Sequence, residues 1–194
     1  MKLLFLFFFV FSISSVTFAK KSPVRLFRDY MNIPGGRVLG IKFTQKQLDH
    51  VQTLAGTLFY KNETSYVYED SCQLIIHKKS NIQTVNKLQK QILYDKNIGG
   101  GLQFLDLLSG RDDRFMFHKE KSLGEQICIP FTLKDWDFSG NLWTLSSNGE
   151  PKRIEIKIAE DYEIITEIEI LDLIGIKPSK SSDFKGYEII DFRE

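Results

Sequence analysis

The stretch "GTLFYKNETSYVYED" (Gly56–Asp70) decides the fold that we expect of this chain. Alternate positions on either side of a short polar insert carry large apolar side chains: Leu58, Tyr60, Tyr66 and Tyr68. Because successive residues of a strand point to opposite faces, the two halves should pair as a hairpin with these side chains on one face. Such a face is either ordinary core or the lining of a cavity for an apolar ligand, and the residues alone leave both interpretations open.

Other segments extend this pattern into a sheet. Ile154, Ile156 and Ile158 alternate with charged residues, which is typical of a strand with one wet face. We expect further strands over 38–43, 73–78, 114–118, 126–133, 141–146 and 162–173, turns at Ser139-Gly140 and Asn148-Gly149, and a short helix over 24–31. Repeated short strands of this kind favour an antiparallel sheet or an open barrel.

One segment, "NIQTVNKLQKQILYD" (Asn81–Asp95), allows two interpretations. Its apolar residues fit a helical stripe, with Ile82, Val85, Leu88 and Ile92 on one side. A strand, a turn at Asn86-Lys87 and a second strand fit as well. Periodicity by itself favours the helix.

Residues 1–19 are typical of a signal peptide. Lys2 precedes an apolar run over 3–11, and Thr17-Phe18-Ala19 offers small residues at the expected cleavage position. The run is shorter than the ~20 residues that a membrane span needs. No cysteine follows it to carry a lipid, so we expect an exported protein that is soluble after cleavage and has no stable membrane span.

Charge and cysteine content limit the function further. The chain has 26 Lys+Arg and 25 Asp+Glu, a net charge of +1, which offers no basic excess for nucleic acid or anionic lipid. Cys72 and Cys128 are the two cysteines. In an oxidising compartment they form either one disulfide or two separate core thiols, and both alternatives stay open.

Catalytic and metal-binding motifs are absent from the sequence. His50, His77 and His118 have no metal-ligand spacing, and neither a nucleophile elbow nor a phosphate-binding loop is present. The charged run Gly110–Phe115 is interpreted as a solvated loop rather than a pair of catalytic carboxylates. We therefore expect a protein that is not an enzyme and that needs no metal or cofactor.

The order of several weak motifs resembles that of the LolA-type outer-membrane lipoprotein carriers. Phe43-Thr44-Gln45-Lys46, followed by Gly56–Lys61, is similar to the opening of that family, and Tyr66-Val67-Tyr68 is similar to its next strand. The later run "LWTLSSNGEPKRIEIKIAEDYEIITEIEI" resembles its late meander. The resemblance covers roughly residues 43–171.

This resemblance implies a fold that is mainly β with a few helices, a curved antiparallel sheet (half-barrel) covered by lid helices. It implies a single domain over 20–194 and a strand-turn-strand over 82–94, which we prefer to the helix. It also implies a periplasmic carrier of lipoprotein acyl chains or another lipid, with an inner-membrane exporter and an outer-membrane acceptor as partners. The expected lining of the acyl cavity is Leu58, Tyr60, Tyr66, Tyr68 and Ile75.

The chain departs from the family at the hairpin tip. The family has an Arg-Pro pair, thought to hold the lid closed, where this chain has Asn62-Glu63. Tyr68 also replaces a tryptophan of the family. The alternative function is that of an exported inhibitor or immunity-type protein that binds another protein through its surface.

Overall fold

The computed structural model describes residues 21–62, 64–96, 107–108, 115–134, 138–171 and 177–193. The signal peptide expected over 1–19 and most of the charged run Gly110–Phe115 lie outside the described residues. Helix α1 (Pro23–Met31) confirms the helix predicted over 24–31. It begins with a proline in its first turn, and the Ser22 side chain caps it by accepting a hydrogen bond from the Arg25 amide.

The described strands all belong to one sheet. Along the chain they are β1 (Arg37–Gln47), β2 (His50–Asn62), β3 (Ser65–Asp70), β4 (Gln73–Lys78), β5 (Asn81–Asn86), β6 (Gln91–Lys96), β7 (Phe115–Phe117), β8 (Lys121–Leu123), β9 (Gln126–Leu133), β10 (Ser139–Leu145), β11 (Pro151–Ala159), β12 (Tyr162–Leu171) and β13 (Glu188–Asp191). A short 3-10 helix, η1 (Ser181–Asp183), precedes β13.

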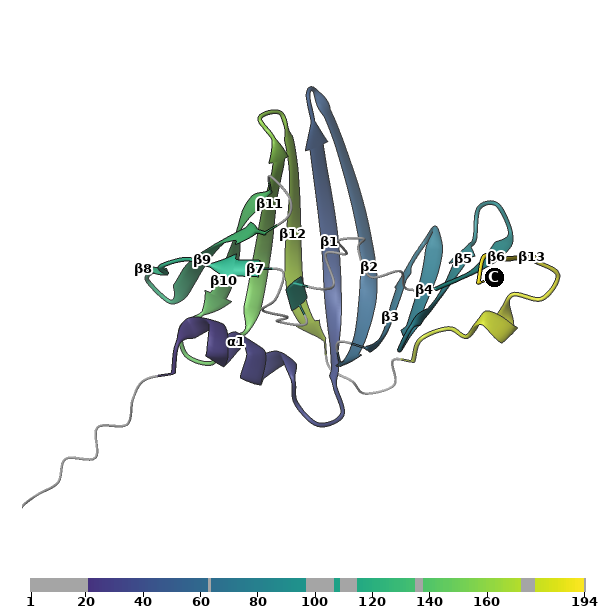
Figure 1. Cartoon of the computed structure of the whole chain (residues 1–194), viewed down its shortest axis with the longest axis horizontal. Coiled ribbons are helices and arrows are strands. Elements are labelled where there is room, and N and C mark those ends of the chain that lie inside the picture. The colour runs from purple at the N-terminus through teal and green to yellow at the C-terminus, as the bar shows by residue number, and fades with distance from the viewer. Residues whose placement is uncertain are drawn as a thin grey trace, which may run out of the picture.

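The order across the sheet is β13-β6-β5-β4-β3-β2-β1-β12-β11-β10-β9-β7, and β8 also pairs with β9. The pairs are antiparallel apart from β13 with β6, which is parallel. The sheet curves without closing, and α1 lies across its lower half (Figure 1). The predicted fold class, a curved antiparallel half-barrel with a helical cover, is confirmed.

The hairpin of β2 and β3 has the predicted register. Leu58 lies opposite Tyr68, and Tyr60 lies opposite Tyr66. All four side chains are buried on the same face of the sheet, which we call the inner face. The shared face predicted from their alternation is therefore confirmed.

The segment that allowed two interpretations forms β5, a turn and β6. The helix favoured by periodicity is wrong. Val85 and Ile92 are cross-strand partners, whereas Leu88 lies in the turn and is 75% exposed. The Asn86 side chain accepts hydrogen bonds from the amides of Leu88 and Gln89, which fixes the turn in place of a helical path.

The turn predicted at Ser139-Gly140 is also wrong, because both residues belong to β10. Gly140 pairs with Phe131 of β9 and Ile156 of β11. A Cβ at this position would overlap the Phe131 ring, so the glycine makes room for an aromatic side chain. The turn predicted at Asn148-Gly149 is confirmed, since the chain reverses there between β10 and β11.

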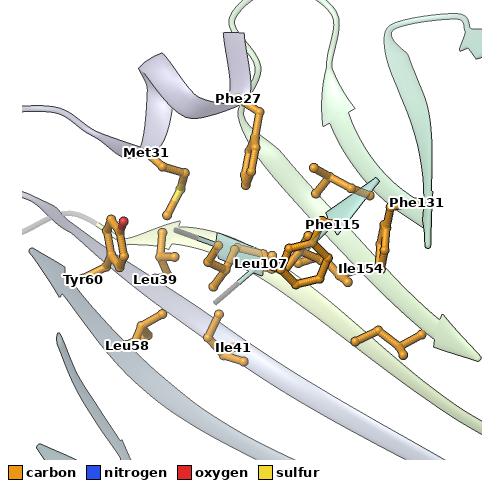
Figure 2. Packing of buried hydrophobic residues seen from close by; sticks show 14 of the residues in the cluster. Phe27, Met31, Leu39, Ile41, Leu58, Tyr60, Leu107, Phe115, Phe131 and Ile154 are labelled. Carbon is orange, nitrogen blue, oxygen red and sulfur yellow. The ribbon is translucent and has the colours of Figure 1, made fainter. Parts of the chain in front are cut away.

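The main core lies between α1 and the inner face. Phe27 and Met31 of α1 are fully buried and point toward the sheet, as Figure 2 shows. Gly149 allows the helix to approach, because a Cβ there would overlap the backbone of Leu26. The side chains that fill this core come from α1, from strands in both halves of the sheet and from residues 107–108; they include Leu39, Ile41, Leu107, Leu108, Phe115, Ile129, Phe131, Leu142, Ile154 and Ile168.

A smaller core lies on the opposite face of the sheet, the outer face, over β3–β6. Leu74, Val85 and Ile92 are buried there. Residues 177–193, which we call the C-terminal strap, cover them with Phe184 and Tyr187 and end by adding β13 beside β6 (Figure 1). The two faces of the sheet are thus covered by two different parts of the chain.

Candidate functional site

An inner pocket of about 240 Å³ lies on the curved inner face, beside the part of the sheet that α1 covers. Its apolar walls are Phe43 of β1, Leu54 of β2 and Ile164 of β12, and Tyr68 of β3 closes one side. Three amide side chains complete the lining: Gln45, Gln52 and Gln73. The pocket therefore offers an apolar floor with polar groups at its border.

Tyr68 is the predicted lining residue that reaches this pocket. Its ring meets that of Phe43 edge to face, with 5.8 Å between centroids, and it lies against Gly56, where no side chain intervenes. Gly56 and Tyr68 both belong to the stretch that predicted the hairpin. A side chain at position 56 would displace the tyrosine ring that closes one side of the pocket.

The other predicted lining residues pack in the core rather than around open space. Leu58, Tyr60 and Tyr66 are at most 5% exposed, and Ile75 is partly buried against them. The Tyr66 ring stacks on His77 at 4.7 Å. The Tyr60 hydroxyl lies 3.5 Å from the side-chain oxygen of Asn32, the residue that ends α1. Tyr60 thus meets the end of α1, and all four side chains belong to the main core.

The Tyr68 hydroxyl is buried and makes no hydrogen bond of standard geometry to the described residues. Burial raises the pKa of Tyr68 well above its ordinary value, and the nearby Asp70 carboxylate raises it further. The phenol therefore stays protonated at physiological pH. The Asp70 carboxylate is the nearby group that interacts with this buried phenol, and the ring rather than the hydroxyl faces the pocket.

Asp70 shapes the border of the inner pocket next to Tyr68. Its carboxylate accepts hydrogen bonds from the amides of Cys72 and Gln73, at 2.6 and 2.8 Å, which fixes the turn from β3 to β4. The same turn carries the Gln73 side chain that lines the pocket. Asp70 therefore positions a polar group of the site through the backbone.

Arg37 holds α1 onto the sheet, and sequence reasoning missed it. Its Nε donates a hydrogen bond of 2.6 Å to the Tyr30 carbonyl, and its guanidinium lies 3.5 Å from the centre of the Tyr30 ring. At the hairpin tip, where an arginine was expected from the resemblance, the Asn62 side chain only accepts hydrogen bonds from Thr64. No known sequence motif predicts a contact between an arginine and an aromatic residue seven positions before it.

Both cysteines are free thiols in the structure. Cys128 is buried in β9 near the Asn141 side chain, whereas Cys72 lies in the turn between β3 and β4 beside Ser71. Strands β2, β1, β12, β11 and β10 separate β3 from β9 in the sheet. Of the two alternatives for the pair, the structure has the separate thiols.

Two other kinds of feature are absent from the described residues. No group of three or more His, Cys, Asp or Glu side chains is arranged to hold a metal ion there. No helix in that part of the chain has the length and apolar character needed to cross a membrane.

Comparisons with known proteins show a likeness of fold at very low sequence identity. No protein-family model and no curated protein matches the sequence. A conserved protein of uncharacterised function from Thermus thermophilus matches with a TM-score of 0.53 and 7% identity, over 87% of this chain and 96% of that one. A DUF1329 family protein from Desulfovibrio piger matches with a TM-score of 0.52 and 8% identity, over 84% and 98%.

A LolA superfamily protein from Nitrosomonas europaea is a more distant match, with a TM-score of 0.44 and 12% identity over 82% of this chain and 97% of that one. The chain has the open, curved sheet that the resemblance predicts, and it spans nearly the full length of the Thermus thermophilus and Desulfovibrio piger structures. The likeness concerns the fold.

Proposed function

We propose that this protein is an exported, periplasmic carrier that binds the acyl chains of lipoproteins, or a related lipid, on the inner face of its sheet. The observation that supports this best is the inner pocket, where Phe43, Leu54 and Ile164 surround an apolar space beside the Tyr68 ring. The apolar walls suit acyl methylene groups, each of which contributes ~0.8 kcal/mol when buried. The amide groups of Gln45, Gln52 and Gln73 at the border suit an ester or amide carbonyl at the head of the chain.

A complete acyl chain needs more room than this pocket provides. Its volume of about 240 Å³ lies below the roughly 300–1,000 Å³ of typical ligand sites. Displacing α1 would uncover Leu58, Tyr60 and Tyr66 beside Tyr68 and extend the pocket along the predicted lining. In this proposal Ile75 adds to the lining at the β4 side.

In this function, the cargo arrives from an inner-membrane exporter and passes to an outer-membrane acceptor. Transfer requires only that the acceptor bury the acyl chain more favourably, so the carrier itself needs no cofactor. The single domain expected over 20–194 would carry the whole binding function. Export through the signal peptide expected over 1–19 would bring it to the periplasm.

The test is lipid extraction of the purified protein, followed by titration with a fluorescent acyl ester. The parent should release bound lipid or take up the ester. Leu54→Trp, which fills the pocket, should weaken uptake about tenfold. Val51→Trp is the matched control, because Val51 is 65% exposed on the same strand. A protein with no lipid and no ester uptake, isolated in a stable complex with one protein partner, would instead support the inhibitor alternative.

A further inference from the structure

A second pocket lies on the other side of the sheet, on its outer face. It has a volume of about 700 Å³, within the range of roughly 300–1,000 Å³ that is usual for ligand sites. One wall is the outer face of β3–β6, and the other is the C-terminal strap over residues 177–182. The carrier function proposed above uses the inner face and leaves this outer pocket without a role.

The floor of the outer pocket is a row of side chains that crosses four strands. Val67 pairs with Ile76, Ile76 pairs with Gln83, and Gln83 pairs with Tyr94. Cross-strand partners point to the same face, so these four side chains lie side by side across about 14 Å of sheet, three strand spacings of about 4.8 Å. Gln83 donates a hydrogen bond of 3.1 Å to the Tyr94 hydroxyl, which leaves the row largely apolar toward the pocket.

The charged residues that line the outer pocket are all basic within the described part of the chain. Lys78, Lys177, Lys180 and Arg193 line it, and none of its described lining residues is Asp or Glu. Arg193 already has Asp191 as its partner and lies over the Tyr94 ring. The three lysines are exposed and make no ion pair with any described residue, so their charge is available to a ligand.

The strap is fixed at both ends, so the outer pocket is a built feature rather than a gap beneath a loose tail. Ser179 donates to the Glu69 carboxylate from its amide, at 3.0 Å, and from its hydroxyl, at 2.7 Å. Lys87 forms an ion pair with the same carboxylate at 3.0 Å. At the other end, β13 pairs with β6, and the Phe192 amide donates to the Tyr94 carbonyl.

From this geometry we propose that the outer pocket is a second ligand site, which binds an acyl chain that ends in an anionic head group. The chain lies along the Val67–Tyr94 row, where the floor is apolar and extended. The carboxylate or phosphate head lies at the border, where Lys177 and Lys180 of the strap and Lys78 of β4 supply positive charge. A neutral lipid would gain the apolar contact alone, so the outer pocket selects for charge in a way that the uncharged inner pocket does not.

The test is fluorescence titration of the full chain with a dansyl-labelled fatty acid and with its uncharged methyl ester. Reversing two strap charges, Lys177→Glu with Lys180→Glu, should weaken binding of the acid about tenfold and leave the ester unchanged. Lys119→Glu with Lys121→Glu is the matched control, because these exposed lysines lie at the far end of the sheet. Gln83→Trp, which fills the outer pocket from a partly exposed position, should abolish binding of the acid there.

Two competitors identify the source of the anionic head. Displacement of the probe by palmitate points to a free fatty acid, and displacement by lysophosphatidic acid points to a lysophospholipid; either outcome supports the proposal. It is overturned if the probe acid does not bind, if neither competitor displaces it, or if the strap double variant binds the acid as the parent does. Should Gln83→Trp fail to fold by circular dichroism, the surface lysine variants decide the result.

The two proposals fail separately. Leu54→Trp acts on the inner pocket alone, so loss of all acid binding in that variant would show that the outer pocket is not a site. Loss of ester uptake with retained acid binding would leave the outer site intact. Absence of ester uptake by the parent protein would overturn the proposal of a carrier site on the inner face. The outer site would then be tested by acid binding in the strap double variant alone.

Discussion

The inner face of this sheet and the outer face over β3–β6 are both apolar, but they are covered by different kinds of structure. The inner face is covered by α1, which contributes Phe27 and Met31 as fully buried side chains. The outer face is covered by an irregular strap, whose Phe184 and Tyr187 are only partly buried. The inner pocket measures about 240 Å³ and the outer one about 700 Å³.

This difference follows from how each cover is attached. A helix presents a stripe of side chains to the sheet. The side chains that hold the helix in place are therefore the same ones that fill the space between the helix and the sheet. The strap is attached by Glu69 and by the pairing of β13, which lie on either side of the pocket. It can therefore stay in place without filling the space beneath it. The predictions below test this contrast.

The largest effect is expected where the inner cover is truncated. Phe27→Ala removes a fully buried ring from the helix cover and should lower the free energy of unfolding by about 3–5 kcal/mol. Urea denaturation of the whole chain measures it. Phe192→Ala, at a residue 58% exposed in the strap, should change the same quantity by less than about 0.5 kcal/mol. Equal losses of unfolding free energy in the two variants would show that the helix and the strap contribute equally to stability.

A smaller and local effect is expected from Glu69→Gln. The substitution keeps the shape of the side chain but removes the charge that Ser179 and Lys87 contact, and hydrogen bonds to charged groups contribute about 1.5–3 kcal/mol. Hydrogen exchange should accelerate in residues 177–193 and stay unchanged in α1. Glu167→Gln is the control, since its ion pair with Lys42 is about half exposed and should contribute less than about 1 kcal/mol. Uniform acceleration along the chain would contradict a local role.

Acid should act on the strap through the same carboxylate. Burial raises the pKa of Glu69, but the Ser179 hydroxyl and amide together with Lys87 outweigh it and hold the pKa below its ordinary value of 4.5. A depressed pKa stabilises the folded state above pH 4.5, and this contribution is lost as the pH falls through the folded value. The strap should therefore loosen only below pH 4.5.

Amide NMR checks this directly, because the Ser179 amide proton reports on the carboxylate to which it donates. Its shift should titrate with a midpoint below 4.5, and the titration should disappear in Glu69→Gln. A midpoint at or above 4.5 would mean that the contacts of the strap do not favour the charged carboxylate.

The smallest expected effect lies at the end of the inner cover. Arg37→Lys keeps the charge but loses the planar contact with the Tyr30 ring and the hydrogen bond from Nε, and should lower the free energy of unfolding by about 1 kcal/mol. The same denaturation series measures it. A loss as large as that of Phe27→Ala would show that Arg37, rather than side-chain packing, holds the helix.

The sequence predicts the inner face far better than the outer one, because local pattern determines the inner face. Alternation over Gly56–Asp70 places Leu58 and the three tyrosines on one face, and the register agrees. Alternation does not show which of them reaches open space. Tyr68 does so because Phe43, Leu54 and Ile164 from three other strands leave a gap beside it, and that gap depends on contacts distant in sequence.

Almost nothing in the local sequence pattern predicts the outer pocket. Its floor combines Val67, Ile76 and Tyr94 from different strands, and its other wall begins at Lys177. The strap itself has the composition of a polar tail, and Ser179 meets Glu69 from a distance of 110 residues along the chain. Over Asn81–Asp95 the preferred strand-turn-strand is confirmed, and the helix that periodicity alone favours is wrong because periodicity ignores the Asn86 side chain that sets the turn.

The parallel strand β13 has a consequence for self-association. An unclosed sheet has two exposed edges, and an exposed edge is a template for pairing with another chain. At one edge, the two short strands β7 and β8, each of three residues, pair with the outer side of β9. At the other edge, β13, which has four residues, pairs with β6, which has six. The last residues of the chain thus replace a long edge by a short one, and a chain cut before Glu188 should aggregate through β6.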